Sequence, residues 1–483
     1  MSATSVAARA VAAPLILALD IGSSSTRAVL YDRLARPVAG MDAQAPNVFR
    51  IGSDGLAEAD PDALLDAAAR CIDTVLAQAD KLAQPIGAVV VDTFVSNIMP
   101  VDADGRSLAP LITYADTRNA ADADALRRDL DERTVHERTG CLLRTSYWPA
   151  RLAWVRRTQP ERWRRVARWL TLGEYLELRL FGRCRVSFSV ASWSGLLDRH
   201  RLVWDAPLLD LLGMAADQLS PLVDSDEPLA GLTEPYASRW PALCAIPWFP
   251  AVGDGAAANI GSGCTGHQRI ALTLGTTGAL RVVQPANAQP LPPGLWCYRV
   301  DRSHALLGGA TSEGGNVYAW MSESLRLGDP AAVEAALAAI PPDGHGLTVL
   351  PFFAGERSPD WAGNVQATLH GLTLGTTPIE IVRASLEAVA YRFALIEQRL
   401  CGRPDCDHRL IASGGALQRS PVWSQIFADV LGRPVVLSAE PEATSRGAAV
   451  LALHALGYFA DLAHIPAADG VVYEPDPARH AIY

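Results

Sequence analysis

The segment from Asp20 to Arg27, DIGSSSTR, combines a carboxylate, a glycine and a run of hydroxyl side chains. Gly22 permits a tight turn, and the amides and hydroxyls around Ser23 and Ser24 could bind phosphate oxygens. A carboxylate at the end of a strand could hold Mg²⁺ directly or through water. Gly/Ser turns beside one aspartate also occur in ordinary hairpins, so this segment alone leaves a phosphate site and a structural turn open.

A second turn repeats the first without its aspartate. The pattern ALDIGSSSTRAVL at residues 18–30 returns in the second half of the chain as ALTLGTTGALRVV at residues 271–283. One carboxylate with several neutral donors suits a phosphate chain, because two close carboxylates would repel each other and the phosphates. The echo predicts two related domains that face one cleft, with Thr276 and Thr277 in the second turn.

Asp254 lies between two glycines, where an apolar run ends and a helical pattern begins. A carboxylate at such a junction could accept the proton of a substrate hydroxyl, or it could cap the helix that follows. Nearer the C-terminus, a predicted strand ends at Gly414-Gly415. An adenine ring and a ribose could approach the backbone there, and a purely structural turn is the alternative.

The elements that must position these residues alternate between short apolar runs and longer helical periodicities, which indicates an α/β protein. Strands are predicted at 15–21, 26–31, 86–94, 269–274, 278–283, 346–353, 408–413 and over VVLS at 435–438. Helices are predicted at 61–80, 118–130, 330–340, 378–399, 421–431 and 444–456. The Pro-rich piece 246–255 marks the predicted boundary, giving domains at 14–250 and 251–457 and an extension at 458–483.

The composition excludes several classes of function. The 483 residues carry 42 basic and 52 acidic side chains, a formal charge of −10, which argues against nucleic acid or an anionic membrane as the main partner. Lys81 is the single lysine, and its context fits neither a P-loop nor a Schiff base. We therefore expect a small-molecule partner, and the sequence leaves open whether the chain forms a homodimer.

The eight cysteines are too scattered for a disulfide framework, so we expect a protein of the reducing cytoplasm. Cys401, Cys406 and His408 could be imagined as a zinc site, but no second pair of ligands follows, and an ordinary loop is the favoured interpretation. No stretch of about 18 residues is apolar without a charge or a Gly/Pro break, so no membrane span is predicted.

Further segments complete a resemblance to the FGGY carbohydrate kinases, within the actin/hexokinase/chaperone-ATPase superfamily, over about residues 15–456. ATLHGLTLGTTPIEIVRASLE at 367–387 is similar to the C-terminal signature of that family. The other segments in family order are GLAEADPDALL (55–65), PLITYADTRNA (110–120), GEYLELRLFG (173–182), SVASWSGLLD (189–198), GERSPDWAGN (355–364) and EATSRGAAVLAL (442–453).

The resemblance implies an α/β fold of two related ribonuclease H-like (actin/hexokinase-type) domains that flank a deep cleft, with ATP and Mg²⁺ as cofactors. Asp20 matches the aspartate linked to Mg²⁺, and Asp254 the catalytic base. The matches to nucleotide-binding residues are Gly22, Ser23 and Ser24 in the first turn, Thr276 and Thr277 in the second, Gly315 near the phosphates, and Gly414, Gly415 and either Gln418 or Arg419 at the adenosine.

For the sugar, Asp116 and Arg118 match the family's W-x-D-x-R segment, in which this chain has Tyr114 in place of the tryptophan. The loop Phe94–Ile98 departs from the family pattern and lacks its histidine; Asn97 in this loop is a predicted sugar contact. The closure of the two domains over a sugar is expected to exclude water.

GGATSEGGNVYAW (308–320) and LPFFAGERSPDWAGN (350–364) look most like gluconate kinases. Gluconate is an anion, so its pocket should hold an unpaired cation, for which Arg118, Arg144 and Arg357 are candidates; each could instead pair with a carboxylate. We expect an ATP-dependent kinase for D-gluconate. A kinase for a ketose or polyol such as xylulose or ribulose is the second hypothesis, and a catalytically silent sugar or nucleotide sensor on the same fold is the third.

Overall fold

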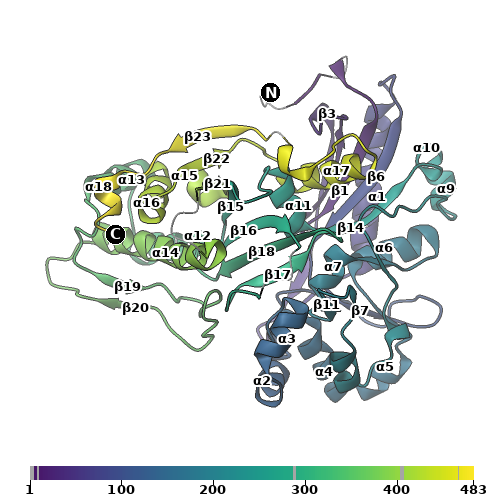
Figure 1. Ribbon diagram of the computed structural model, residues 1–483, viewed down its shortest axis with the longest axis horizontal. Helices are drawn as coiled ribbons and strands as arrows, with labels where there is room; N and C mark the ends of the chain where they lie inside the picture. The colour runs from purple at the N-terminus through teal and green to yellow at the C-terminus, as the bar shows by residue number, and fades with distance from the viewer. Residues whose placement is uncertain (1–4, 8–9, 287–289, 403–406, 466) are drawn as a thin grey trace.

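The computed structural model describes residues 5–7, 10–286, 290–402, 407–465 and 467–483. The chain forms two lobes, each built around its own β-sheet, and the lobes lie side by side in Figure 1. Among the described helices, none has the length and apolar character needed to cross a membrane.

The N-terminal sheet has five strands in the order β14-β6-β1-β2-β3. β1, β2 and β3 pair antiparallel in sequence, whereas β6 and β14 run parallel to β1 on its other side. The strands are β1 (Leu15–Ile21), β2 (Ser25–Tyr31), β3 (Pro37–Pro46), β6 (Ile86–Thr93) and β14 (Trp248–Gly253).

The C-terminal sheet repeats this arrangement within seven strands, in the order β17-β18-β16-β15-β21-β22-β23. β15, β16 and β18 pair antiparallel, and β21 and β22 are parallel to β15. The strands are β15 (Arg269–Leu274), β16 (Gly278–Pro285), β17 (Trp296–Arg299), β18 (His304–Thr311), β21 (Arg409–Ser413), β22 (Val435–Ser438) and β23 (Asp469–Tyr473). The shared strand order and sense confirm two related domains of the ribonuclease H-like type.

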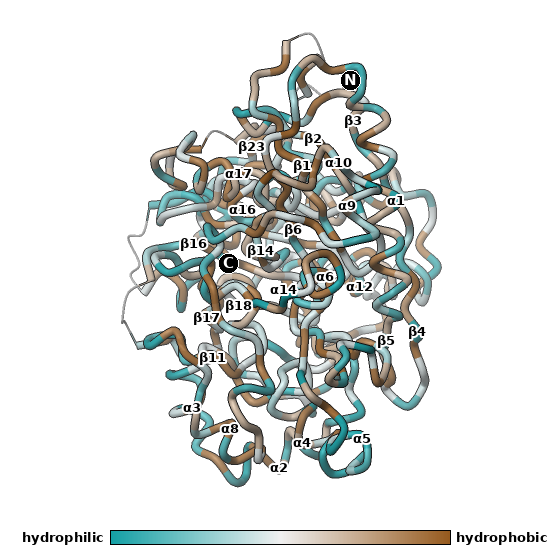
Figure 2. Tube along the Cα trace, turned by 90° about the vertical axis from the view of Figure 1, so that its right-hand side faces the viewer, coloured by the Kyte–Doolittle hydropathy of each residue, from teal (hydrophilic) through white to brown (hydrophobic). Residues whose placement is uncertain are grey.

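Helices cover the outer faces of both sheets, and apolar segments run through the interior of the trace in Figure 2. α1 (Pro61–Ala79) packs on β2 and β3, and begins where Asp60 accepts the amide N–H groups of Asp62 and Ala63. α14 (Pro378–Cys401) packs on β16 and β18, and begins with a capping box of Thr377 and Glu380. Beside α14 lie α12 (Gly315–Ser324), α13 (Pro330–Ala339) and α16 (Pro421–Leu431).

Two helices cross where the lobes meet: α11 (Asp254–Gly261), which follows β14, and α17 (Ala443–Ala455), which also contacts β1 and β6. A methyl group built on Gly447 would lie 1.8 Å from the carbonyl oxygen of Ala257, and one on Gly261 would lie 1.8 Å from that of Ala443. The two backbones therefore touch, and only glycine fits at these two positions.

Shorter elements complete both lobes. In the N-terminal lobe they are β4 (Phe49–Ile51), β5 (Ala57–Ala59), β7 (Met99–Val101), β8 (Leu111–Ile112), α2 (Ala120–Asp129), α3 (Glu132–Thr139), α4 (Trp148–Thr158), α5 (Pro160–Arg165), β9 (Arg168–Leu170), α6 (Leu172–Phe181), β10 (Val186–Ser187), α7 (Phe188–Ser192), β11 (Leu197–Asp198), β12 (Val203–Trp204), α8 (Ala206–Leu212), η2 (Ala216–Gln218), β13 (Leu222–Val223), α9 (Tyr236–Arg239) and α10 (Pro241–Cys244). In the C-terminal lobe they are β19 (Thr348–Leu350), β20 (Thr368–His370), α15 (Gly415–Arg419), η3 (Leu462–His464) and α18 (Pro477–His480).

Most predicted elements lie within two residues of their observed bounds, but three features differ. The predicted boundary between residues 250 and 251 falls inside β14, whose Pro250 sits at an irregularity in its pairing with β6. The apolar run 346–353 forms only the short strand β19. The extension after residue 457 is part of the C-terminal lobe, because β23 pairs with β22 and α18 packs on α16.

Candidate active site

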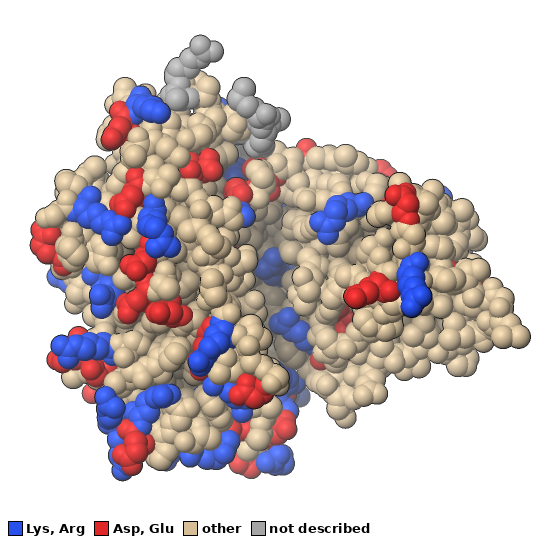
Figure 3. Space-filling model, turned by 180° about the vertical axis from the view of Figure 1, so that it is seen from behind, with Lys and Arg blue, Asp and Glu red and all other residues tan. Residues whose placement is uncertain are grey.

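A cleft of about 820 Å³ lies between the lobes and takes side chains from both. Figure 3 shows the groove from behind, with basic side chains along it. The N-terminal lobe contributes Val95, Ser96, Tyr114, Ser146, Tyr147 and Trp193, and α11 contributes Asp254, Gly255 and Ala258. The C-terminal lobe contributes, among others, Thr273, Thr277, Arg281, Trp296, Tyr298, Arg357, Gly414 and Gln418.

Three carboxylates gather where neighbouring parallel strands of the N-terminal sheet end. Asp20 on β1 is in register with Asp92 on β6, and Gly253 on β14 is in register with Thr93, which places Asp254 one residue further on. The carboxyl ends of parallel strands share one edge of a sheet, so these three side chains form one cluster. Asp20 and Asp254 were expected here from the sequence, whereas Asp92 was not.

Asp254 is the first residue of α11, and Gly253 occupies the capping position. Its Oδ1 accepts the amide N–H of Gly255 at 2.7 Å, and no other hydrogen bond to this carboxylate comes from the described residues. Burial, then the charge of Asp20, raise the pKa of Asp254 to about 6, while Arg281 opposes the shift. A carboxylate with this pKa, open to the cleft, can accept a proton near neutral pH.

Asp92 is fully buried, and no backbone amide or basic side chain of the described residues donates a hydrogen bond to its carboxylate. Burial raises its pKa well above the usual range, and the charges of Asp20 and Asp254 raise it further. Burial also raises the pKa of Asp20, against the opposing charge of Arg27. Three neighbouring carboxylates, of which Asp92 receives no N–H donor, offer the oxygen ligands that a divalent cation such as Mg²⁺ prefers, so the cluster fits a cation.

The two predicted hairpins form as expected. In the first, the amide N–H of Gly22 donates to the carbonyl of Ser25 at 2.9 Å; in the second, that of Gly275 donates to the carbonyl of Thr277 at 3.0 Å. The hydroxyls at the two tips make no hydrogen bond to any other described residue, and all four side chains are exposed: Ser23, Ser24, Thr276 and Thr277. Both tips therefore retain donors for a ligand.

Two further predicted nucleotide positions lie against the second hairpin. Gly315 begins α12, and its amide N–H donates to the carbonyl of Gly275 at 2.8 Å. Gly414 has φ +95°, and a methyl group on it would lie 2.4 Å from the carbonyl oxygen of Leu274. The glycine turn after β21 is thus pressed against the phosphate turn after β15.

Gln418 and Arg419, the alternatives for a ribose contact, lie differently. Gln418 lines the cleft. Arg419 folds back over the turn, since a methyl group on Gly415 would lie 2.6 Å from its Nη1. The geometry favours Gln418, and the contact itself stays a prediction.

An aromatic wall of the cleft, built from rings of both lobes, was missed from the sequence. The ring centroids of Trp193 and Tyr298 are 3.6 Å apart, and those of Trp296 and Tyr298 are 4.6 Å apart. The hydroxyl of Tyr298 is hydrogen-bonded to that of Tyr147 at 2.5 Å. The residues come from the position after α7, from β17 and from the segment before α4, so no local motif could have revealed the wall.

The structure corrects the prediction that the side chain of Asn97 contacts the sugar. This side chain is fully buried, and both ends of its amide are used: Nδ2 donates to the carbonyl of Phe94 at 2.5 Å, and Oδ1 accepts the amide N–H of Leu172 at 2.8 Å. Asn97 therefore holds the loop in shape. Its neighbours Val95 and Ser96 line the cleft instead.

The predicted pair Asp116 and Arg118 also lies apart from the described lining of the cleft. The Arg118 guanidinium pairs with Asp116 and with Glu58, both at 2.7 Å, and stacks over Trp154 at 4.7 Å. Two carboxylates neutralise this arginine, so it is not the unpaired cation that an anionic substrate requires. Contact of Asp116 and Arg118 with a sugar stays a prediction.

The other two candidate arginines differ in the same respect. Arg144 forms an ion pair with Glu132, whereas Arg357 has no carboxylate at ion-pair distance among the described residues. Both lie near the ring of Trp361, at 5.2 Å and 5.8 Å from its centroid. Arg357 lines the cleft, so of the three candidates it alone meets the expectation of an unpaired cation there.

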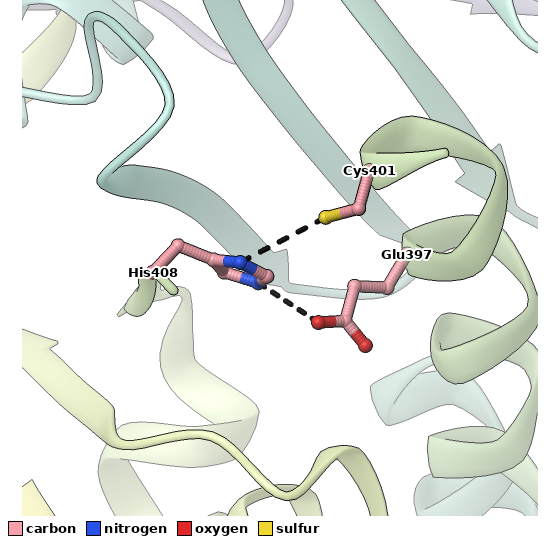
Figure 4. A group of neighbouring side chains, drawn as sticks. All are labelled: Glu397, Cys401 and His408. Atoms are coloured by element: carbon pink, nitrogen blue, oxygen red, sulfur yellow. Dashed lines mark hydrogen bonds and ion pairs between the residues drawn. The ribbon is translucent and has the colours of Figure 1, made fainter. Parts of the chain in front are cut away.

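Away from the cleft, Glu397, Cys401 and His408 form a small cluster (Figure 4). The imidazole Nε2 of His408 faces a carboxylate oxygen of Glu397 at 2.8 Å, and its Nδ1 faces the sulfur of Cys401 at 3.8 Å. One ion could bind only one of these two nitrogens, whereas Glu397 and Cys401 face different nitrogens of the ring, so the geometry does not favour a single metal site. Cys406 lies outside the described residues.

Comparisons with known proteins cover nearly the whole chain. Residues 15–261 match the N-terminal domain of the FGGY family of carbohydrate kinases, and residues 270–456 match its C-terminal domain. A gluconokinase of Bacillus subtilis (strain 168) is 27% identical over 92% of this chain and 88% of its own. A glycerol kinase of Rhodospirillum centenum is 31% identical over 93% of this chain and 91% of its own.

A ligand-bound xylulose kinase from Lactobacillus acidophilus superimposes with a TM-score of 0.90 at 26% identity, covering 97% of this chain and 95% of that one. The three relatives are named for three different substrates. The class of reaction is common to all of them, and the choice of acceptor must come from the cleft of this chain.

Proposed function

This chain belongs to the FGGY family of carbohydrate kinases, and from that premise we propose that it transfers the terminal phosphoryl group of ATP to a hydroxyl of an aldonate, with D-gluconate as the leading substrate. The phosphotransferase activity follows from the family. The aldonate, the cofactors ATP and Mg²⁺ and the roles of individual residues are the proposal.

The observation that supports an aldonate as the substrate is the unpaired guanidinium of Arg357 in the cleft. A carboxylate that leaves water needs a charge-assisted partner, and the planar guanidinium can supply two parallel N–H donors. The neighbouring aromatic wall and the hydroxyls of Tyr114, Ser146 and Tyr147 suit the carbon chain and hydroxyl groups of a sugar acid.

Asp254 would accept the proton of the attacked hydroxyl, because its carboxylate lines the cleft and keeps a free oxygen among the described groups. Asp20 and Asp92 would hold Mg²⁺, which when bound supplies positive charge to the phosphates. The tips of the two hairpins, with Gly315 beside the second, would donate to phosphate oxygens. Gly414, Gly415 and Gln418 would receive the adenosine.

An ADP-release assay with Mg-ATP against aldonates, pentuloses, hexuloses and polyols tests the proposal, with ATP hydrolysis in the absence of sugar as the control. Turnover that depends on gluconate, and that exceeds turnover with neutral acceptors, is the expected result. Activity with neutral sugars alone would refute the aldonate. No turnover with any sugar, with ATP binding intact, would favour a sensor.

A kinase for a ketose or polyol is the second candidate. Val95 and Ser96 line the cleft, and the loop 94–98 lacks the histidine of the family pattern, so this loop presents a different surface to the acceptor. The relatives named for xylulose and glycerol support the same candidate. In the panel above, its signature is turnover with neutral acceptors that equals or exceeds turnover with gluconate.

A further inference from the structure

Arg281 is a second unpaired arginine of the cleft, and neither the sequence motifs nor the proposed roles above use it. It lies on β16, three residues after Gly278 at the second hairpin, opposite Ala271 of β15. The other cleft-lining residues from strands of the C-terminal sheet are small, hydroxyl-bearing or aromatic: Ala271, Thr273, Gly278, Ala279, Trp296, Tyr298, Ala310 and Ser413. Arg281 is therefore the one charged side chain among the described cleft-lining residues from these strands.

The contacts of Arg281 fix its position but leave most of its donors unused. Nη2 donates to the Thr273 hydroxyl at 2.9 Å, and that hydroxyl is 3.2 Å from the hydroxyl of Ser413. Nε is buried without a hydrogen-bond partner, and Nη1 makes none to any described residue. No carboxylate of the described chain lies at ion-pair distance from it. A half-buried guanidinium with a buried, unpaired Nε is costly unless an anion completes it.

The free Nη1 lies beside the proposed base. A methyl group built on Gly255, the residue after Asp254, would lie only 3.0 Å from Nη1. The charge of Arg281 is felt at Asp254, where it lowers the pKa of the carboxyl. The guanidinium thus lies between the second phosphate turn, where β16 begins, and the point where the attacked hydroxyl would sit.

We infer that Arg281 is a further catalytic residue, which donates from Nη1 to the phosphoryl group as that group passes from ATP to the substrate hydroxyl beside Asp254. This inference rests on the proposed function. In the transition state of phosphoryl transfer, negative charge is spread over the oxygens of the transferred group. A fixed guanidinium stabilises this transition state more than it stabilises the ground state.

In this step the substrate oxygen forms a bond to the terminal phosphorus, and its proton passes to the carboxylate of Asp254. The bond from that phosphorus to the bridging oxygen of ATP breaks, and its electron pair leaves with ADP. Arg281 keeps all its protons throughout. Asp254 afterwards loses its proton to water.

The test compares Arg281→Met and Arg281→Lys with a matched control, Arg269→Met, which removes an arginine from β15 that pairs with Asp469 outside the cleft. Arg281→Met should lower kcat by about 10²- to 10³-fold, the usual cost of one transition-state donor, with KM for sugar and ATP changed no more than about threefold. Arg281→Lys should recover part of the loss, added guanidinium ions should rescue Arg281→Met, and Arg269→Met should turn over normally.

Two readouts separate this role from a structural one. Calorimetry should give Arg281→Met an unchanged affinity for ADP but a loss of at least about 10²-fold for ADP with aluminium fluoride, which mimics the group in flight. A kcat that recovers fully at high pH would mean that Arg281 acts only on the pKa of Asp254, and would overturn the inference. So would a raised KM for gluconate at unchanged kcat, which is the signature of a carboxylate contact.

Failure of the proposed function is distinguishable from failure of the inference. Kinetics use whichever acceptor the wild-type protein prefers, so a neutral acceptor overturns the aldonate and leaves the Arg281 comparison intact. If no acceptor works, the aluminium fluoride measurement and the hydrolysis of ATP by water still decide it. Equal behaviour of wild type and Arg281→Met in both would overturn it. Melting curves of both Arg281 variants exclude a folding defect, and Arg281→Lys carries the test if Arg281→Met fails to fold.

Discussion

Replacing Arg357 by methionine tests how the cleft selects a charged acceptor. Arg357 lines the cleft, has no carboxylate partner among the described residues and rests on Trp361, so its charge is available to a ligand. A hydrogen bond to a charged group contributes about 1.5–3 kcal/mol. Each 1.4 kcal/mol is a factor of ten, so Arg357→Met should raise KM for gluconate by about ten- to a hundredfold.

The same change should leave a neutral acceptor almost unaffected, since a polyol presents no carboxylate to the guanidinium. Arg144→Met is the matched control: Arg144 lies near the same Trp361 ring, but Glu132 already neutralises it. The assay is ADP release at saturating Mg-ATP over a range of gluconate and of a neutral acceptor, with kcat and KM fitted separately. An unchanged KM for gluconate in Arg357→Met, or an equal loss for both acceptors, would refute the assignment.

Three further outcomes are expected. Asp254→Asn should lower kcat by about 10²-fold or more with ADP affinity retained in calorimetry; near-normal turnover would remove Asp254 from the role of base. In the wild type, kcat/KM should fall as the pH drops through about 6, because burial and the charge of Asp20 raise the pKa of Asp254 to that value and the protonated carboxyl cannot accept a proton; a profile flat down to pH 4.5 would contradict this. Gly447→Ala should destabilise the protein by about 1–3 kcal/mol in denaturant melts because its methyl group meets the carbonyl of Ala257, whereas Gly328→Ala, with open space around it, should not; equal stabilities would show that the helices can separate without cost.

The strands and helices that the sequence predicted well are those with a strong apolar period and clear ends. The run LILALDI forms β1 as predicted, and α16 begins and ends where Pro421 and Gly432 indicate. The predicted strands leave out β3, and they leave out β14 although the run before Gly253 is apolar and strand-like, because each segment contains proline, which argues against a central strand. Pro37 and Pro46 lie at the two ends of β3, and Pro250 lies at an irregularity, positions where a missing N–H is tolerated.

The residues of the candidate site also fall into those that a local motif predicts and those that only the fold brings together. Asp20, Asp254 and Gly414 could be found because each sits in a local motif whose geometry is set by its neighbours. Asp92 looks like one acid in an apolar run, and it becomes part of the cluster only through the parallel pairing of β1 with β6. The position of Arg281 beside Asp254 likewise depends on the packing of β16 against α11, which no local motif reveals.

Asn97 and Arg118 show the opposite case, although the contact of Arg118 with a sugar stays a prediction. Their motif positions suggested contact with a ligand, but the number of polar partners decides what a side chain does. The side-chain amide of Asn97 is hydrogen-bonded to the backbone of Phe94 and Leu172, and the guanidinium of Arg118 forms ion pairs with Asp116 and Glu58. Such pairings join residues that are far apart in the chain, and no local pattern reveals them.

The contact of α11 with α17 has a mechanical consequence. The backbones of the two helices touch at Gly261 and Gly447, so this contact would act as the hinge of a rotation of one lobe relative to the other. In such a rotation each atom moves in proportion to its distance from the hinge. Asp254 begins α11 only about 10 Å along the helix from Gly261, whereas the tip of the second hairpin belongs to the C-terminal lobe. A rotation about this crossing would therefore hold the proposed base nearly still and change mainly the distance from which the phosphate donor must arrive.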